Sequence, residues 1–300
     1  MKTKIINMSY NAMFRAVFSN NKYLLSKLVK AILDYYKIDI PINENDLILK
    51  KNELDTNNFY EKQLICDYIV RINDSFDLNI EINREKYLGL KERNLTYSFK
   101  IYGSHFKSGD DYSKFNSYTM LQVNYNTFRN SNGKCVNCFY MIDVDDIKNR
   151  LTSNFSILNI DIASCYNLVY NNNNLEEILP IHAFGAMMYC NYLEEISSIL
   201  ERGIIDMDNE EKTKFLNDVK EKSQDKEIEE VIRLESSIEE RFNWIEAIAR
   251  AETRKEVTKD IIKPMLKKGL SYEDISDISK CTIEEIKKMA NEVGISEISD

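Results

Sequence analysis

The sequence predicts a mixed α/β core over residues 1–170, followed by a helical and highly charged C-terminal part. Two observations favour this fold class. Before residue 170, segments with the alternation or β-branched content of strands are interleaved with segments of helical apolar spacing. From Leu175 onward nearly all apolar spacing is helical, and Pro180 and Pro264 are the expected breaks or kinks. We therefore expect three parts: the α/β core at 1–170, a charged helical region at 171–268, and a small helix-turn-helix-like tail at 269–300.

Two helices are predicted near the start of the chain. Apolar residues from Met13 to Phe18 have the spacing of a short amphipathic helix, which places Arg15 on a different side from Phe14. A longer helix is expected to begin at Asn20 or Asn21, because asparagine is a common N-cap residue. Its apolar side comprises Leu24, Leu25, Leu28, Val29, Ile32 and Leu33.

Strand patterns begin after Pro41. Residues 63–72 and 78–83, separated by turn formers at 73–77, predict a β-hairpin. Further strands are expected at 118–125, 135–142 and 156–163. Between the hairpin and the first of these strands, spacings of four, three and four predict a helix over 93–106. Its apolar face comprises Leu95, Phe99, Tyr102 and Phe106.

The charged C-terminal part has two features of its own. Ser271 with Asp274, and Thr282 with Glu285, match a helix-capping pattern and predict two short helices. Their arrangement resembles a helix-turn-helix, although packing or partner contact is as good an explanation as DNA reading. Apolar positions at helical spacing over 227–268 suit either helix-on-helix packing or self-association, and we expect a homo-oligomer formed through the C-terminal helices.

Composition sets limits on the partners and the compartment. The net charge of −9 and the pI of about 5.1 disfavour a simple nucleic-acid coat protein. No acidic residue precedes Asp34, which leaves open either a local basic face or an ordinary solvated surface. No stretch approaches the roughly 18 apolar residues that span a bilayer, and the start lacks an apolar signal-peptide core. We expect a cytoplasmic protein with no membrane segment.

The cysteines do not indicate a disulfide scaffold, because six in 300 residues are too few. Cys135 and Cys138 form a lone CxxC pair, but zinc requires four ligands. The two histidines, His105 and His182, are far apart in sequence. A structural role with reduced thiols is therefore the favoured interpretation.

Three polar residues of the predicted hairpin could perform chemistry. Glu81 and Asn83 share one face of their strand, and Asp67 joins them if residues of equal parity pair. Two neighbouring acids repel each other unless a divalent cation lies between them, and Mg²⁺ suits one or two carboxylates plus water and phosphate oxygens. Asp67 lies in an apolar run, where an unpaired carboxylate is costly. The pattern predicts metal-assisted phosphodiester hydrolysis, although solvated acidic sheet faces also occur.

The order of several short segments resembles the PD-(D/E)XK nuclease family transposases, also called recombination-promoting nucleases. The likeness is carried by Phe14-Arg15 to Phe18, Cys66-Asp67-Tyr68-Ile69-Val70, Ile80-Glu81-Ile82-Asn83, Arg93 to Tyr97, and Gly109-Asp110-Asp111-Tyr112. It extends into the ending Leu266-Lys267-Lys268-Gly269-Leu270-Ser271-Tyr272-Glu273-Asp274-Ile275. This resemblance implies a restriction-endonuclease-like mixed sheet flanked by helices, followed by a helical C-terminal region.

The resemblance also implies roles. Asp67 and Glu81 match the metal-binding acids, with Mg²⁺ as the expected cofactor and Mn²⁺ as a substitute. Asn83 falls where the family carries Lys or Gln, and an amide cannot supply the charge of Lys. Arg84, Lys86 or Arg93 could replace that charge.

DNA contacts are expected from four residues: Arg15, Lys86, Arg93 and Tyr97. Arg93 and Tyr97, one helical turn apart, form either a phosphate-facing edge or a surface Arg stacked on its neighbour.

Three functional hypotheses follow from these observations. The first is a Mg²⁺-dependent DNA endonuclease in recombination, transposition-like processes or defence, with Asp67, Glu81 and Asn83 as catalytic residues. The second is an inactive nuclease-fold protein that serves as a DNA-binding or protein-interaction module. The third is an RNA-cleaving effector.

Overall fold

The computed structural model describes residues 2–19, 21–42, 44, 47–49, 53–54, 64–65, 68–73, 75–106, 108–111, 113, 117–172, 174–237, 260–279 and 281–293. The chain divides into two compact units, Met1–Ser236 and Ser237–Asp300. The division into parts at 1–170, 171–268 and 269–300 stays a prediction.

A mixed sheet forms the centre of the first unit. In the described residues six strands run in the order β1-β4-β5-β6-β8-β7. β1 (Ile48–Leu49), β4 (Tyr68–Asn73) and β5 (Phe76–Asn83) pair antiparallel, as do β8 (Phe155–Asp161) and β7 (Val136–Tyr140). β6 (Thr119–Asn126) lies parallel between β5 and β8. A separate pair joins β2 (Glu53–Leu54) and β3 (Leu64–Ile65). The mixed α/β prediction is confirmed, and the β4–β5 pair is the predicted hairpin.

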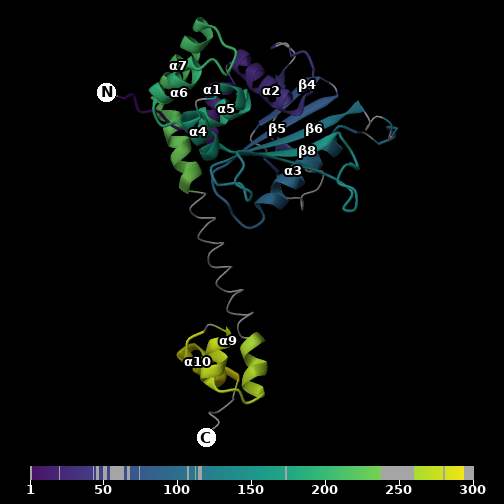
Figure 1. Ribbon diagram of the computed structural model, residues 1–300, viewed down its shortest axis with the longest axis vertical. Coiled ribbons are helices and arrows are strands. Elements are labelled where there is room, and N and C mark those ends of the chain that lie inside the picture. The colour runs from purple at the N-terminus through teal and green to yellow at the C-terminus, as the bar shows by residue number, and fades with distance from the viewer. Residues whose placement is uncertain are drawn as a thin grey trace. The chain divides into compact units, whose positions relative to one another are not determined.

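Helices cover both faces of this sheet. α2 (Lys22–Tyr36) and α3 (Leu90–Ser104) lie on opposite sides of the strands (Figure 1). On the α2 side, α1 (Asn11–Phe18), α4 (Ile162–Asn171) and α5 (Pro180–Tyr189) belong to the main apolar core. One face of the sheet also belongs to this core. It includes the even-numbered residues of β5 and the residues that lie beside them on β6 and β8, namely Leu78, Ile80, Ile82, Leu121, Val123, Tyr125, Leu158 and Ile160.

The α3 side of the sheet is only partly apolar. A smaller cluster there contains Ile69, Tyr97, Ile101, Tyr118, Met120 and Phe155. The helix predicted over 93–106 is confirmed, but its predicted apolar face is wrong in part, since Phe99 is 50% exposed. Asn94 and Ser98 are buried instead. The strand opposite presents Gln122, which requires a hydrogen-bonding partner, and Ser98 donates to it, while Asn94 accepts from Arg93.

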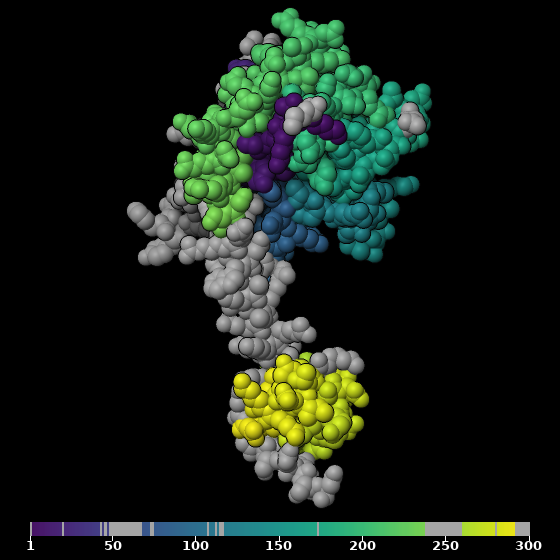
Figure 2. Space-filling model, turned by 90° about the vertical axis from the view of Figure 1, so that its left-hand side faces the viewer, coloured from purple at the N-terminus to yellow at the C-terminus, as the bar shows by residue number. Residues whose placement is uncertain are grey.

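The later helices of the first unit are rich in charged residues. They include the 3₁₀ helix η3 (Leu175–Glu177), α6 (Leu193–Glu201), α7 (Asn209–Lys222) and helical residues 226–236. The N-terminal segment, residues 2–9, lies against this region, as Figure 2 shows. Lys4 forms a β-bridge with Tyr192, and the Ile6 amide donates to Ser223 Oγ at 3.0 Å.

The second unit contains two short helices at the predicted positions, α9 (Tyr272–Ser279) and α10 (Ile283–Val293). They pack with helical residues 260–267 around Ile262, Leu266 and Ile275. The Thr282 amide donates to Glu285 Oε2 at 2.9 Å, and the Glu285 amide donates back to Thr282 Oγ1 at 3.3 Å. The helix caps read from the sequence are therefore present. No helix in the described part of the chain is both long and apolar enough to span a bilayer.

Candidate functional site

The candidate site lies on the polar face of β5 and β6, under α3. Alternation along β5 directs Asn79, Glu81 and Asn83 to this face. The parallel register pairs them in turn with Gln122, Asn124 and Asn126 of β6. All six side chains are buried, although the sequence pattern alone would suit a solvated sheet face.

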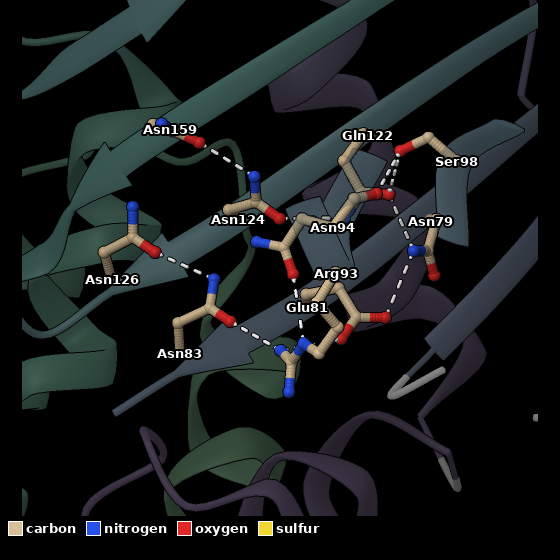
Figure 3. Close-up of polar contacts among 10 residues, drawn as sticks. All are labelled: Asn79, Glu81, Asn83, Arg93, Asn94, Ser98, Gln122, Asn124, Asn126 and Asn159. Carbon is tan, nitrogen blue, oxygen red and sulfur yellow. Dashed lines mark hydrogen bonds and ion pairs between the residues drawn. The ribbon is translucent and has the colours of Figure 1, made fainter. Parts of the chain in front are cut away.

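Amide side chains connect these strands in a hydrogen-bonded row (Figure 3). Asn79 Nδ2 donates to Gln122 Oε1 at 2.7 Å, and Gln122 Nε2 donates to Asn124 Oδ1 at 2.8 Å. Asn124 Nδ2 then donates to Asn159 Oδ1 of β8, also at 2.8 Å. Ser98 of α3 donates to Gln122 Oε1 at 2.9 Å. An amide carries both donors and an acceptor, so a row of amides can pair buried polar groups without adding charge, although Asn79 Oδ1 has no hydrogen-bond partner among the described residues.

Glu81 brings a negative charge into this buried row. Its side chain is 1% exposed, and its Oε1 accepts from Asn79 Nδ2 at 3.1 Å. Arg93 Nη2 lies 3.6 Å from Glu81 Oε2, a distance for an ion pair rather than a hydrogen bond. A buried carboxylate needs positive charge nearby, and Arg93 supplies some of it.

Asn83 lies beside Glu81 and contacts the same arginine. Arg93 Nη2 donates to Asn83 Oδ1 at 2.8 Å, while Asn83 Nδ2 donates to Asn126 Oδ1 at 2.9 Å. The structure thus brings three predicted site residues together: Glu81, Asn83 and Arg93 (Figure 3).

The other predicted residues occupy different positions. Asp67 lies outside the described residues, and the described hairpin pairing reaches Tyr68 opposite Ile80. Lys86 is exposed in the connection between β5 and α3. Tyr97 is buried, with the Arg93 guanidinium 5.4 Å from its ring centroid. Arg15 is half-buried on α1. Its charge acts on Tyr68 of β4, because it opposes the rise in the Tyr68 pKa that burial causes.

Sequence reasoning missed the amides Asn79, Gln122, Asn124, Asn126 and Asn159. A signal was present, since polar residues at 79, 81 and 83 and at 122, 124 and 126 repeat at the same spacing in two strands. That repetition could have indicated a shared polar layer between sheet and helix.

The donor set decides whether a divalent cation fits. Glu81 offers carboxylate oxygens, the ligand type that Mg²⁺ prefers. Within the described residues no cluster of three or more His, Cys, Asp and Glu side chains could hold a metal. Among the described residues that line this site, Glu81 is the carboxylate that could hold a cation.

The strand order and the flanking helices define a nuclease-like α/β fold. The model of the PD-(D/E)XK nuclease family transposases matches residues 10–183, more than half of the chain, and the protein belongs to that family. No curated protein and no solved structure matches the chain. The matched region includes every strand of the sheet and the residues of the candidate site.

Proposed function

We propose that this protein is a Mg²⁺-dependent endonuclease that hydrolyses phosphodiester bonds in DNA during recombination or transposition-like processes. The observation that carries the proposal is the buried carboxylate of Glu81, positioned with Asn83 and an arginine at the polar face of a nuclease-family sheet. The family name supports a nuclease-like function, and the proposal extends it to DNA, to Mg²⁺ and to the cytoplasm.

The chain's own residues have distinct tasks in this proposal. Asp67 and Glu81 would hold the cation, which when bound would neutralise charge on the phosphate and acidify an attacking water. Asn79 fixes one Glu81 oxygen through its 3.1 Å hydrogen bond and so orients the carboxylate. Asn83 and Arg93 line the same site. Arg15, Lys86, Arg93 and Tyr97 are the proposed DNA contacts.

Cleavage of supercoiled plasmid by the full-length chain tests the proposal. We expect nicking with Mg²⁺ or Mn²⁺, none with a chelator, and none for Asp67→Ala. Arg150→Gln is a matched control, because Arg150 is exposed and stacks on Tyr140 at 3.6 Å. An RNA substrate in the same assay separates a ribonuclease from a deoxyribonuclease. If wild-type protein cleaves neither substrate with either metal, and Asp67→Ala changes only stability, the chain is a non-enzymatic module.

We also propose a homo-oligomer formed through the C-terminal helices. Val231 and Leu234, on helical residues 226–237, are 44% and 55% exposed, which is high for apolar side chains one turn apart. Light scattering over a wide concentration range tests this proposal. A monomeric mass throughout would contradict it.

A further inference from the structure

The third position of the family pattern, which the resemblance fills with Lys or Gln, is Asn83 in this chain. An asparagine side chain is uncharged and cannot neutralise a phosphate. The structure nevertheless holds a positive charge directly against this side chain, because Arg93 Nη2 lies 2.8 Å from Asn83 Oδ1. The charge reaches the site from α3 instead of from β5.

Several contacts hold this guanidinium in place, among them a 3.3 Å hydrogen bond from Arg93 Nε to Asn94 Oδ1. On one side, Asn83 accepts its hydrogen bond and is itself anchored to Asn126 on the neighbouring strand. On the other, the guanidinium carbon lies 5.4 Å and 5.7 Å from the ring centroids of Tyr97 and Tyr87. These contacts restrict the arginine to a small region beside Glu81.

Exposure distinguishes Arg93 from the carboxylate that it accompanies. The Arg93 side chain is 34% exposed, whereas that of Glu81 is 1% exposed. Arg93 therefore connects the buried acid with solvent, where a DNA strand would approach. A guanidinium can donate two parallel hydrogen bonds to a phosphate, which a lysine ammonium cannot do with the same geometry.

The other two candidate cations have different surroundings. The Arg84 guanidinium lies 3.3 Å from the ring centroid of Tyr10, on the N-terminal side of α1. Lys86 is exposed in the loop that precedes α3. Arg93 is the one of the three for which a hydrogen bond to Asn83 is found.

We propose that Arg93 supplies the positive charge that position 83 lacks, binding the phosphate at the reacting centre. Asn83 is then a positioning residue that orients the guanidinium. This inference rests on the proposed nuclease function and assigns contact with the scissile phosphate to Arg93.

A charge-relocation experiment in the full-length chain tests this inference. The variants are Arg93→Gln, Arg93→Lys and the double variant Asn83→Lys/Arg93→Gln, with Arg150→Gln as the control. We expect Arg93→Gln to lower kcat for plasmid nicking by about 10²- to 10³-fold, the usual effect of removing a transition-state stabiliser. The double variant should recover at least about tenfold of that loss, because it returns a cation to the same point from β5.

DNA affinity measured with a chelator gives a readout that does not depend on turnover. Fluorescence anisotropy with a short duplex should show weaker binding by Arg93→Gln and a salt dependence reduced by about one phosphate contact. Arg93→Lys should keep that salt dependence while cleaving more slowly than wild type, since a point charge lacks the bidentate geometry.

The possible outcomes separate the two proposals. Absence of cleavage by wild-type protein would overturn the nuclease function and this inference with it. Wild-type cleavage that persists undiminished in Arg93→Gln overturns this inference alone. If thermal melting shows that Arg93→Gln is unfolded, the double variant decides: a folded but inactive double variant contradicts the relocation of charge, and an active one supports it.

Discussion

Arg71 and Asp77 face each other across the β4–β5 hairpin, and the guanidinium donates two hydrogen bonds, each 2.8 Å long, to the carboxylate. Tyr118 Oη adds a third donor to Asp77 at 2.8 Å, and Arg71 Nη2 contacts His105 Nδ1 at 3.1 Å. The Asp77 side chain is fully buried, whereas that of Arg71 is 19% exposed. The pair therefore fixes the hairpin whose second strand carries Glu81 and Asn83.

We predict that Asp77→Ala destabilises the fold. Removing one partner leaves the other charge uncompensated, which for buried pairs costs on the order of 3 kcal/mol or more. Urea unfolding followed by circular dichroism measures the change. Lys30→Gln, at the exposed pair of Lys30 with Asp34, is the control and should change stability far less. Equal losses in the two variants would contradict a special role for the hairpin pair.

We predict that alanine substitutions at Gly185 and Gly103 change the stability of the fold in opposite directions. A Cβ at Gly185 of α5 would lie 3.0 Å from Cys165 Sγ and 3.3 Å from Ile160 Cγ2, and both neighbours are fully buried. Overpacking of this kind costs about 1–3 kcal/mol. A Cβ at Gly103 of α3 meets no heavy atom within 4 Å, so alanine should stabilise the helix by about 0.5–1 kcal/mol.

Thermal melting of Gly185→Ala and Gly103→Ala measures both effects. Adding Cys165→Ala to Gly185→Ala should restore part of the lost stability, because it removes the sulfur that the new methyl group contacts. A melting temperature for Gly185→Ala at or above that of wild type would contradict the predicted crowding.

We predict that the stability of the fold decreases in mild acid because of His182. Burial lowers the pKa of its imidazole below the usual 6.5, and Nδ1 accepts a hydrogen bond from the Leu179 amide at 3.2 Å. Protonation removes that acceptor and charges a partly buried ring. As pH falls from about 6.5 toward the folded pKa, the unfolded chain takes up a proton that the folded chain does not, so stability decreases. Above about pH 6.5 the contribution of the neutral ring is fully present.

The matched variant is His182→Gln, which keeps a side-chain acceptor at the third position of α5. As pH falls from 7 to 5, the unfolding free energy of wild type should decrease relative to that of His182→Gln. Parallel pH profiles for the two proteins would show that His182 does not titrate on unfolding.

Glu81→Gln tests the metal through stability instead of cleavage. A ligand that binds only the folded state stabilises it, by about 2.7 kcal/mol at a hundredfold excess over Kd. We predict that Mn²⁺ raises the melting temperature of wild type and not that of Glu81→Gln, since the amide removes one of the two proposed carboxylates. The same rise in both proteins would place the metal elsewhere.

The sequence was sufficient to predict the β4–β5 hairpin, the later strands β6, β7 and β8, and the shared face of Glu81 and Asn83, but not the short strands β1 and β2. Alternation along a strand depends only on backbone geometry, so parity could be read without a structure. The apolar face of α3 could not be predicted correctly, because periodicity treats Asn94 and Ser98 as solvent-facing residues. Their burial depends on polar strands that come before and after them in sequence.

The partnership of Arg93 with Asn83 was beyond sequence reasoning for a different reason. A long side chain on a helix can point in several directions, and its choice here depends on Tyr87, Tyr97 and Glu81 acting together. Glu81 could be identified as a candidate residue from its strand, but the charge that accompanies it depends on tertiary packing.

The packing of residues 2–9 against the region around Tyr192 and Ser223 has a consequence for synthesis on the ribosome. The Thr3 amide donates to the Glu194 carboxylate across 191 positions, and the Ile6 amide donates to Ser223 Oγ across 217. Contacts of such long range form slowly because a large loop must close first. Residues 2–9 are made well before residues 192–223, so their contacts with Tyr192, Glu194 and Ser223 can form only after the helices of that region have left the ribosome.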